Sequence, residues 1–239
     1  MTNEKITVEV CANSLESVLA GQAGGAVRIE LCTNSEEGGI TPSLVQIQRV
    51  RMAVDIQLYI LIRPRIGDFI YDVGEFERMK QIIQLCGAMG CDGVAVGMLT
   101  PQGAVDTRRC AELIRMARDF AMGVTFHRAF DCCSDQFQAL EDIINLGCDR
   151  ILTSGGRRSA PEGAAVIKQL IDRAAGRISI MPGAGITDEN IAELVRTTGL
   201  KEFHGTFQHF YAGKLLTDTN KVKEVIRIAN NINSYETIP

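Results

Sequence analysis

The sequence predicts a single α/β domain over residues 1–239, folded as a closed (β/α)8 barrel, or TIM barrel. Strand-like runs rich in Val, Ile and Leu recur at a steady interval, and amphipathic helical patterns lie between them. Strands that alternate with helices form parallel sheets, and eight such units in 239 residues suit a closed barrel. No linker or change in composition divides the chain.

The strands are expected as eight short segments in chain order. They are residues 6–11, 28–32, 55–63, 93–99, 123–130, 150–154, 178–184 and 202–207.

The helices between them are recognised by apolar residues at i, i+3 and i+4 spacing, as in residues 74–90. Several end in a glycine just before the next strand, and Thr41 and Thr187 are expected as helix N-caps. A loop over 209–218 should lead into a last amphipathic helix over 219–232.

Composition excludes several classes of protein. The chain is 46% hydrophobic and 23% charged, with a formal net charge of -4 and no basic run, so nucleic acid is not expected as a partner. No segment approaches 18 uninterrupted apolar residues and no signal-like segment opens the chain, which predicts no membrane partner and a cytoplasmic location. The eight cysteines are expected to be reduced, and without a C-x-x-C pair they do not form a zinc module.

Strand alternation separates an apolar face from a polar one. In "RIELC", Ile29 and Leu31 share one face, while Arg28, Glu30 and Cys32 share the other. In a barrel the apolar face packs on the helices, so the polar face lines the interior. The expected interior residues are Glu9, Cys11, Glu30, Cys32, Tyr59, Leu61, Arg63, Ala95, Gly97, Thr125, His127 and His204.

These charged side chains have two interpretations. Buried charges are tolerated when they are paired, so the charged members, with Arg65, can form a network that serves stability alone. The alternative is a binding site, which is favoured because the polar residues gather near the C-terminal ends of the strands, where barrel active sites lie.

Two glycine-rich loops support a pocket. "TSGG", with Ser154, Gly155 and Gly156, and "PGAG", with Gly183 and Gly185, follow the sixth and seventh strands. Their backbone N–H groups are candidates for binding an anion, as in the loops of later strands in such barrels. Glycine-rich turns that only reverse the chain are the alternative.

The motifs in order resemble those of the CutC family of copper homeostasis proteins, over about residues 6–207. The resemblance rests on "VEVCANSLES", "RIELC", "EGGITPS", "LIRPRIGDFIY", "DGVAVGMLT", "VTFHRAFD", "RILTSGG", "IMPGAGIT" and "EFHGTF".

The resemblance implies a cytoplasmic TIM barrel that forms a homodimer or higher homo-oligomer and binds Cu(I), with Cys11 and Cys32 as the metal ligands. Thiolates are soft ligands that suit Cu(I), and both cysteines end neighbouring strands. Two positions depart from the family pattern: Ile66 replaces a usual Gly, and Gly205 follows His204 where Cys is frequent.

Two functions are therefore expected. The first is copper homeostasis through Cu(I) bound by the strand-end cysteines. The alternative is an enzyme that acts on a small anionic metabolite, a carboxylate or phosphate. Without a dinucleotide fingerprint or P-loop, no nucleotide cofactor is implied. The residues of this alternative are Arg63, Arg65 and His204 with the two glycine loops for the anion, Glu9 or Glu30 as general base, and His127 as acid or electrophile.

Overall fold

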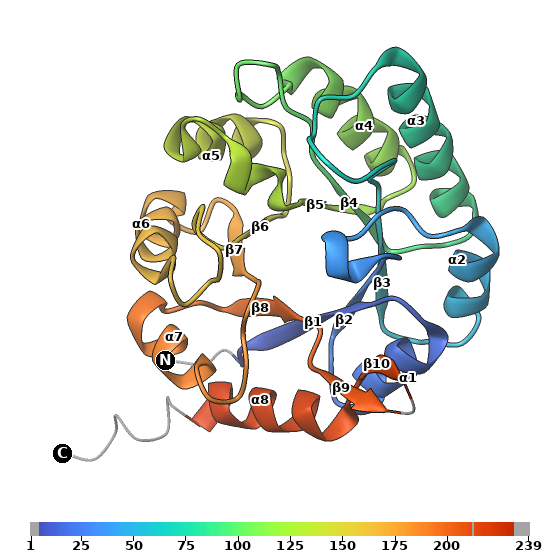
Figure 1. Cartoon of the computed structure of the whole chain (residues 1–239). Helices are drawn as coiled ribbons and strands as arrows, with labels where there is room; N and C mark the ends of the chain where they lie inside the picture. Colours follow the sequence, from blue (N-terminus) through green and yellow to red (C-terminus); the bar gives the residue numbers. More distant parts are fainter. Residues whose placement is uncertain (1–4, 212, 232–239) are drawn as a thin grey trace.

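Eight parallel strands form one barrel in the computed structural model, which describes residues 5–211 and 213–231. Hydrogen-bonded ladders run in the order β7, β6, β5, β4, β3, β2, β1, β8, and contacts between β7 and β8 bring the two ends of the sheet together. Figure 1 shows the strands as an inner ring. The strands are β1 (Thr7–Ala12), β2 (Arg28–Leu31), β3 (Gln57–Leu61), β4 (Gly93–Val96), β5 (Gly123–Phe126), β6 (Arg150–Thr153), β7 (Ser179–Pro182) and β8 (Glu202–Gly205).

Helices surround the ring of strands, which confirms the predicted TIM barrel (Figure 1). Two short 3-10 helices, η1 (Ser35–Glu37) and η2 (Arg128–Cys132), follow β2 and β5. The α-helices are α1 (Leu15–Ala23), α2 (Leu44–Arg51), α3 (Val73–Ala88), α4 (Thr107–Asp119), α5 (Gln136–Asn145), α6 (Ala164–Ala174), α7 (Ile191–Thr198) and α8 (Thr219–Asn231).

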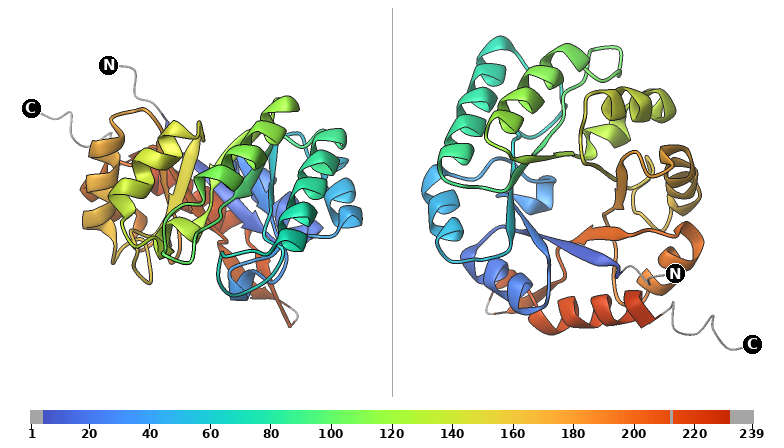
Figure 2. Two further views of the ribbon diagram at one scale, coloured as in Figure 1. Left: turned by 90° about the horizontal axis from the view of Figure 1, so that it is seen from above. Right: turned by 180° about the vertical axis from the view of Figure 1, so that it is seen from behind.

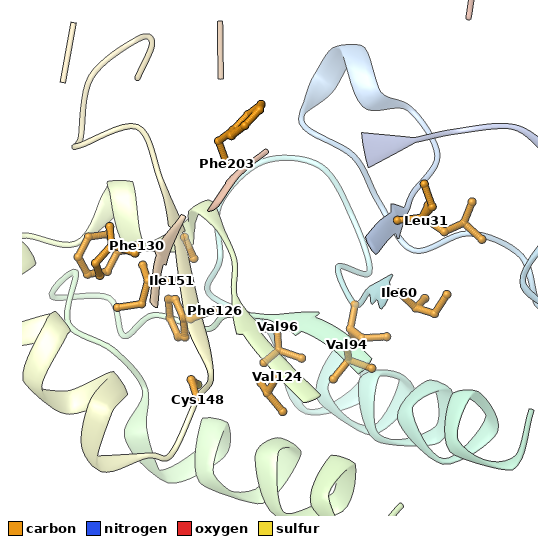
Figure 3. Packing of buried hydrophobic residues seen from close by; sticks show 14 of the residues in the cluster. Leu31, Ile60, Val94, Val96, Val124, Phe126, Phe130, Cys148, Ile151 and Phe203 are labelled. Atoms are coloured by element: carbon orange, nitrogen blue, oxygen red, sulfur yellow. The ribbon is translucent and has the colours of Figure 1, made fainter. Parts of the chain in front are cut away.

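The main apolar core lies between the strands and the helices. Ile29 and Leu31 are fully buried there, as the alternation of β2 predicts. Val94, Val96 and Val124 extend the same layer over α3 and α4 (Figure 3). Burying a side chain of this size contributes roughly 1.5–3 kcal/mol, so this layer supplies much of the stability of the fold.

Both expected N-caps are wrong. The hydroxyl of Ser43, not Thr41, accepts the Gln46 N–H at the start of α2, whereas the Thr41 hydroxyl accepts the backbone N–H of Arg63 at 2.8 Å. Helix α7 begins at Ile191, after a turn in which Asn190 accepts the Thr187 N–H at 2.9 Å. This turn leaves Thr187 in the wall of the cavity described below.

The segment expected as a loop over 209–218 contains most of an antiparallel hairpin. Strands β9 (Gln208–Tyr211) and β10 (Lys214–Thr217) pair beside α1, and the hairpin projects from one end of the barrel (Figure 2). The final helix is confirmed as α8, with Ile232 outside the described residues. Within the described residues, no helix combines the length and apolarity needed to cross a bilayer.

Candidate functional site

The lower half of the barrel interior, near the strand N-termini, holds a network of ion pairs. Arg28 donates from Nε to the Glu9 carboxylate and from Nη2 to Glu202 at 2.6 Å. Arg150 donates to the other oxygen of Glu202 at 3.2 Å. We call Glu9, Arg28, Arg150 and Glu202 the lower network. Its carboxylates each receive an arginine, which is the condition for keeping such charges buried.

Tyr59 supports this network from β3. Its ring centroid lies 5.1 Å from the guanidinium carbon of Arg28 and 5.2 Å from that of Arg150. Gly93 and Gly123 leave the space for the ring, because a Cβ at either position would collide with Tyr59. The interior of this barrel is therefore filled by stacked charged and aromatic side chains in place of the usual branched apolar layers.

A cavity of about 480 Å³ opens above the lower network, at the strand C-termini. This volume lies within the range of small-molecule sites, roughly 300–1,000 Å³. Among the side chains and backbone expected to form a site, the lining includes Cys11, Glu30, Cys32, Arg63, His127, Gly185 and His204. Glu9 lies deeper, hydrogen-bonded beneath His204.

Two thiols and two polar side chains gather on one wall of this cavity. The Sγ atoms of Cys11 and Cys32 are 3.4 Å apart. One donor atom each from Cys11, Glu30 and His204 lies within 4.8 Å of the others, and all three residues are buried. We call Cys11, Cys32, Glu30 and His204 the thiol wall. Its sulfur and nitrogen atoms are donors for soft and borderline metal ions.

The protonation of the thiol wall follows from its surroundings. Burial raises the pKa of Glu30 to about 7, although His204 opposes the shift. The thiol of Cys32, followed by burial, raises the pKa of Cys11 well above its ordinary value. Burial alone would lower the pKa of His204, but its hydrogen bond to Glu9 and the charges of Glu30 and Glu9 together outweigh this effect and raise the pKa. At neutral pH Cys11 is therefore a thiol in the metal-free protein.

The pKa of Glu9 shifts in the opposite direction from that of Glu30. Its Oε1 lies 2.7 Å from His204 Nδ1, and its other oxygen accepts from Arg28. Burial alone would raise the pKa of Glu9, but Arg28 and His204 hold it at about 2. Glu9 is thus an ionised carboxylate that orients the His204 ring and directs Nε2 toward Glu30, at 3.9 Å.

Another part of the cavity lining carries Arg63 and His127, which both contact the ring of Phe69. Nδ1 of His127 accepts the Ala129 N–H at 3.2 Å, while Nε2 is buried and has no partner among the described residues. Burial and the charge of Arg63 lower the pKa of His127 to about 3, so the ring is neutral. We call Arg63 and His127 the donor wall.

Arg65 lies outside the set of cavity-lining residues. Its guanidinium donates to Glu75 at 2.7 Å and to Asp68 at 2.8 Å, and the side chain is 38% exposed. Its expected role in anion binding stays a prediction. The carboxylates of Glu75 and Asp68 already pair with its guanidinium.

The loop over 153–156 already binds a carboxylate of the same chain, that of Asp131. Oδ1 of Asp131 accepts the Ser154 and Gly156 N–H groups at 3.1 Å and the Thr153 hydroxyl at 2.5 Å. Positive φ angles of 70° at Gly155 and 66° at Gly156 shape this concave backbone. An external anion expected at Ser154, Gly155 and Gly156 would have to displace Asp131.

The second glycine loop reaches the cavity only in part. Gly185 lines it, and Gly183 packs behind, donating its N–H to Thr153 at 2.9 Å. Ala184 and Phe207, which also line the cavity, have φ of 76° and 47°. Left-handed backbone at residues other than glycine is strained, and such strain clusters at functional sites.

Sequence reasoning missed several contributors. Arg28 was placed on the polar face of its strand but was not selected for the site, and Arg150 and Glu202 begin their strands at positions where alternation already predicts an interior side chain. The ion pair of Arg28 with Glu202 joins β2 to β8. Because these strands are far apart in the sequence, no local motif predicts it. Asp131 and Arg128 were not among the predicted site residues, although Arg128 lines the cavity.

Comparison with known proteins identifies the family. The CutC family model matches residues 6–209. The chain belongs to the CutC family. A CutC family protein from Xanthomonas campestris pv. campestris (strain 8004) is 49% identical over 199 residues, covering 83% of this chain and 82% of the relative. A mouse protein named as a copper homeostasis protein cutC homolog is 48% identical over 197 residues, covering 82% and 72%.

Solved structures agree with this assignment. A protein from Streptococcus agalactiae described as a CutC copper homeostasis protein matches with a TM-score of 0.79 and 33% identity, covering 84% of this chain and 98% of that one. Phosphoribosyl anthranilate isomerase from Thermotoga maritima matches with a TM-score of 0.62 at 15% identity, covering 95% and 99%. The second likeness shows the barrel fold alone.

Gly205 departs from the expected CutC motif for a visible steric reason. A Cβ at Gly205 would collide with the ring of Phe207, which folds back beside β8. Gly205 leaves this position without a third thiol, and a ring nitrogen of His204 on β8 lies within 4.8 Å of donor atoms of Cys11 and Glu30.

Proposed function

We propose that this CutC family protein acts in copper homeostasis and binds Cu(I) as cargo through Cys11 and Cys32. The separation of 3.4 Å between their Sγ atoms, at buried ends of neighbouring strands, carries the proposal. Two thiolates that converge on one point suit a soft monovalent ion.

His204 supplies a third donor in this proposal. Its Nδ1 is held by Glu9, and a ring nitrogen lies within 4.8 Å of donor atoms of Cys11 and Glu30. A carboxylate behind a ligating imidazole fixes the ring and strengthens it as a ligand. The carboxylate of Glu30 is a hard donor and contributes little to a soft ion.

The experiment is an anaerobic Cu(I) titration against a chromophoric chelator. Wild type should bind one ion per chain, Cys11→Ser and Cys32→Ser should abolish tight binding, and His204→Gln should weaken it. Because binding displaces the proton of Cys11, affinity should also fall as the pH is lowered.

Cys132→Ser is the matched control, because this thiol is exposed and does not line the cavity. It should bind Cu(I) as wild type does. Copper binding that is indifferent to both Cys11→Ser and Cys32→Ser would refute the proposal.

A second candidate function is enzymatic. The cavity is far larger than one ion requires, and Glu30, with a pKa of about 7, is suited to act as a general base near neutral pH. Conversion of a small anionic metabolite, a carboxylate or a phosphate, followed by proton NMR, should occur with wild type and be lost in Glu30→Gln. If wild type converts none of a broad panel of such anions, this candidate fails.

We further propose a cytoplasmic location and a homo-oligomeric state. Eight free cysteines, six of them buried, support a reducing compartment. Exposed apolar residues on the β9–β10 hairpin support association between copies. Fluorescence imaging of a tagged chain tests the location, and light scattering tests the association.

A further inference from the structure

The cavity contains a cation, Arg63, that no carboxylate in the described part of the chain neutralises. Arg63 is 6% exposed, and no carboxylate of the described residues lies within ion-pair distance of it. Its Nη1 donates to the Gly39 carbonyl and its Nη2 to the Gly67 carbonyl, both at 2.9 Å. Carbonyl groups satisfy hydrogen bonds but cancel no charge. A buried charge without a counterion is costly, so this position favours an anion.

A second donor stands beside that cation. Since Nδ1 of His127 accepts the Ala129 N–H, the proton of the neutral ring is on Nε2. That Nε2 is buried and has no partner among the described residues, whereas the side chain of Arg63 also interacts with the buried Tyr71 hydroxyl. The donor wall therefore offers the charge of Arg63 and one Nε2–H group that lacks an acceptor.

The position of His127 is set by its neighbours. A Cβ at Gly97 would lie 2.6 Å from Cε1 of His127, so the ring occupies the space that a side chain there would fill. The ring of Phe69 contacts the imidazole with a centroid distance of 5.2 Å and lies 4.9 Å from the guanidinium carbon of Arg63. One aromatic side chain thus holds both donors in place.

We infer that the donor wall is a binding site for the carboxylate of a small organic acid, with Arg63 supplying the charge and His127 a fixed Nε2–H donor. The single positive charge of Arg63 balances the single negative charge of a carboxylate, but not the charge of about −1.5 to −2 on a phosphate group near pH 7. The rest of the acid would occupy the remaining volume of the cavity.

This inference deepens the second candidate function by naming its substrate class, and it rests on that candidate only for turnover. Binding is a separate property of the donor wall. A bound acid that is never converted would refute the enzyme and keep the site, whereas failure to bind would refute the site itself.

The test measures binding of small aliphatic acids, such as acetate and glycolate, to the full chain by ligand-observed NMR. The matching amides and inorganic phosphate serve as the comparison probes. The acids should bind and the amides should not. Equal binding of acids and amides, or tighter binding of phosphate, would overturn the inference.

Matched variants locate the site. Arg63→Gln should weaken acid binding roughly 10- to 100-fold, because a charged hydrogen bond is lost. Arg78→Gln, on the exposed face of α3 and outside the cavity lining, should bind as wild type does. Equal losses in both variants would contradict the assignment, and circular dichroism checks that each variant is folded.

His127→Asn tests the donor without removing the cap. The Asn side-chain oxygen can still accept the Ala129 N–H, but the Asn amide N–H groups lie closer to the backbone and do not reach the position of Nε2–H. Acid binding should weaken several-fold. Independently of any variant, nitrogen-15 NMR of wild type should show the Nε2–H tautomer, with the Nε2 resonance moving when acid is added. An Nδ1–H tautomer would rule out the proposed role.

Discussion

Glu9 and Glu30 are two buried carboxylates on neighbouring strands with opposite electrostatic states. Glu9 belongs to the lower network, where Arg28 and His204 hold its pKa at about 2 in spite of burial. Glu30 faces the cavity, where burial dominates and raises its pKa to about 7. One of its oxygens has no hydrogen-bond partner among the described residues. Charged side chains in the lower network are therefore paired with one another, whereas those that line the cavity are incompletely paired.

The arginines show the same contrast. Arg28 contacts two carboxylates, whereas Arg63 contacts backbone carbonyls. Complete pairing serves stability, because each charge compensates another. Incomplete pairing beside a cavity is characteristic of a binding site, where a ligand supplies the missing partner.

Removing Arg28 should have the largest effect on stability. Arg28→Met leaves Glu9 without its arginine and Glu202 with Arg150 alone, so the free energy of unfolding should fall by about 3–5 kcal/mol. Urea denaturation measures this loss. Arg63→Met is the comparison variant and should cost clearly less, since no ion pair is broken. Equal losses would show that the two halves do not differ.

The two glutamates should give opposite pH dependences of stability. The pKa of Glu30 is raised from an ordinary value of 4.5 to about 7, so its contribution is complete below pH 4.5 and is lost as the pH rises through 7. The pKa of Glu9 is lowered from 4.5 to about 2, so its contribution is present above pH 4.5 and is lost as the pH falls through 2. Each amounts to something on the order of 3 kcal/mol.

Urea denaturation of the metal-free protein at pH 5 and pH 8 tests the Glu30 branch. Wild type should be less stable at pH 8, and Glu30→Gln should remove most of that difference. A slope that survives unchanged in Glu30→Gln must come from another group, and the contrast with Glu9 would then lose its basis.

Paired glycine substitutions should separate packing from binding with a smaller effect. Gly93→Ala places a methyl group against Tyr59 in the lower half and should destabilise the protein by about 1–3 kcal/mol. Gly97→Ala pushes against His127, so it should weaken acid binding more than Gly93→Ala does. Thermal unfolding and ligand-observed NMR on both variants give the comparison. The reverse ranking in acid binding would place the ligand elsewhere.

The smallest effect on stability is expected outside the barrel. Phe210 and Tyr211 on β9 are 65% and 70% exposed, so Phe210→Ser with Tyr211→Ser should change the free energy of unfolding by only about 0.5 kcal/mol. If the hairpin joins copies of the chain, light scattering should show a smaller assembly for the double variant. An unchanged assembly would move the interface to another surface.

Much of the fold was predictable because it follows from local periodicity. Alternation along each strand placed Glu9, Cys11, Glu30 and His127 in the interior, and the regular alternation of strands and helices predicted the barrel. The two expected N-caps were wrong, and the hairpin was missed because a loop was expected there. Each of these features depends on single turns, whose geometry composition constrains weakly.

The sequence by itself determined which side chains enter the barrel, since the period of two along a strand is a property of the chain. Only the tertiary structure decided which of them meet. Glu9 and His204 are 195 positions apart, and their contact depends on β1 pairing with β8. Arg63 and Arg65 look alike in sequence, yet the backbone after β3 turns one into the cavity and the other toward Glu75. A buried charge that is paired within the chain stabilises the fold, whereas an unpaired one favours the binding of a ligand. Which charges are paired depends on distances across the barrel that no local pattern encodes.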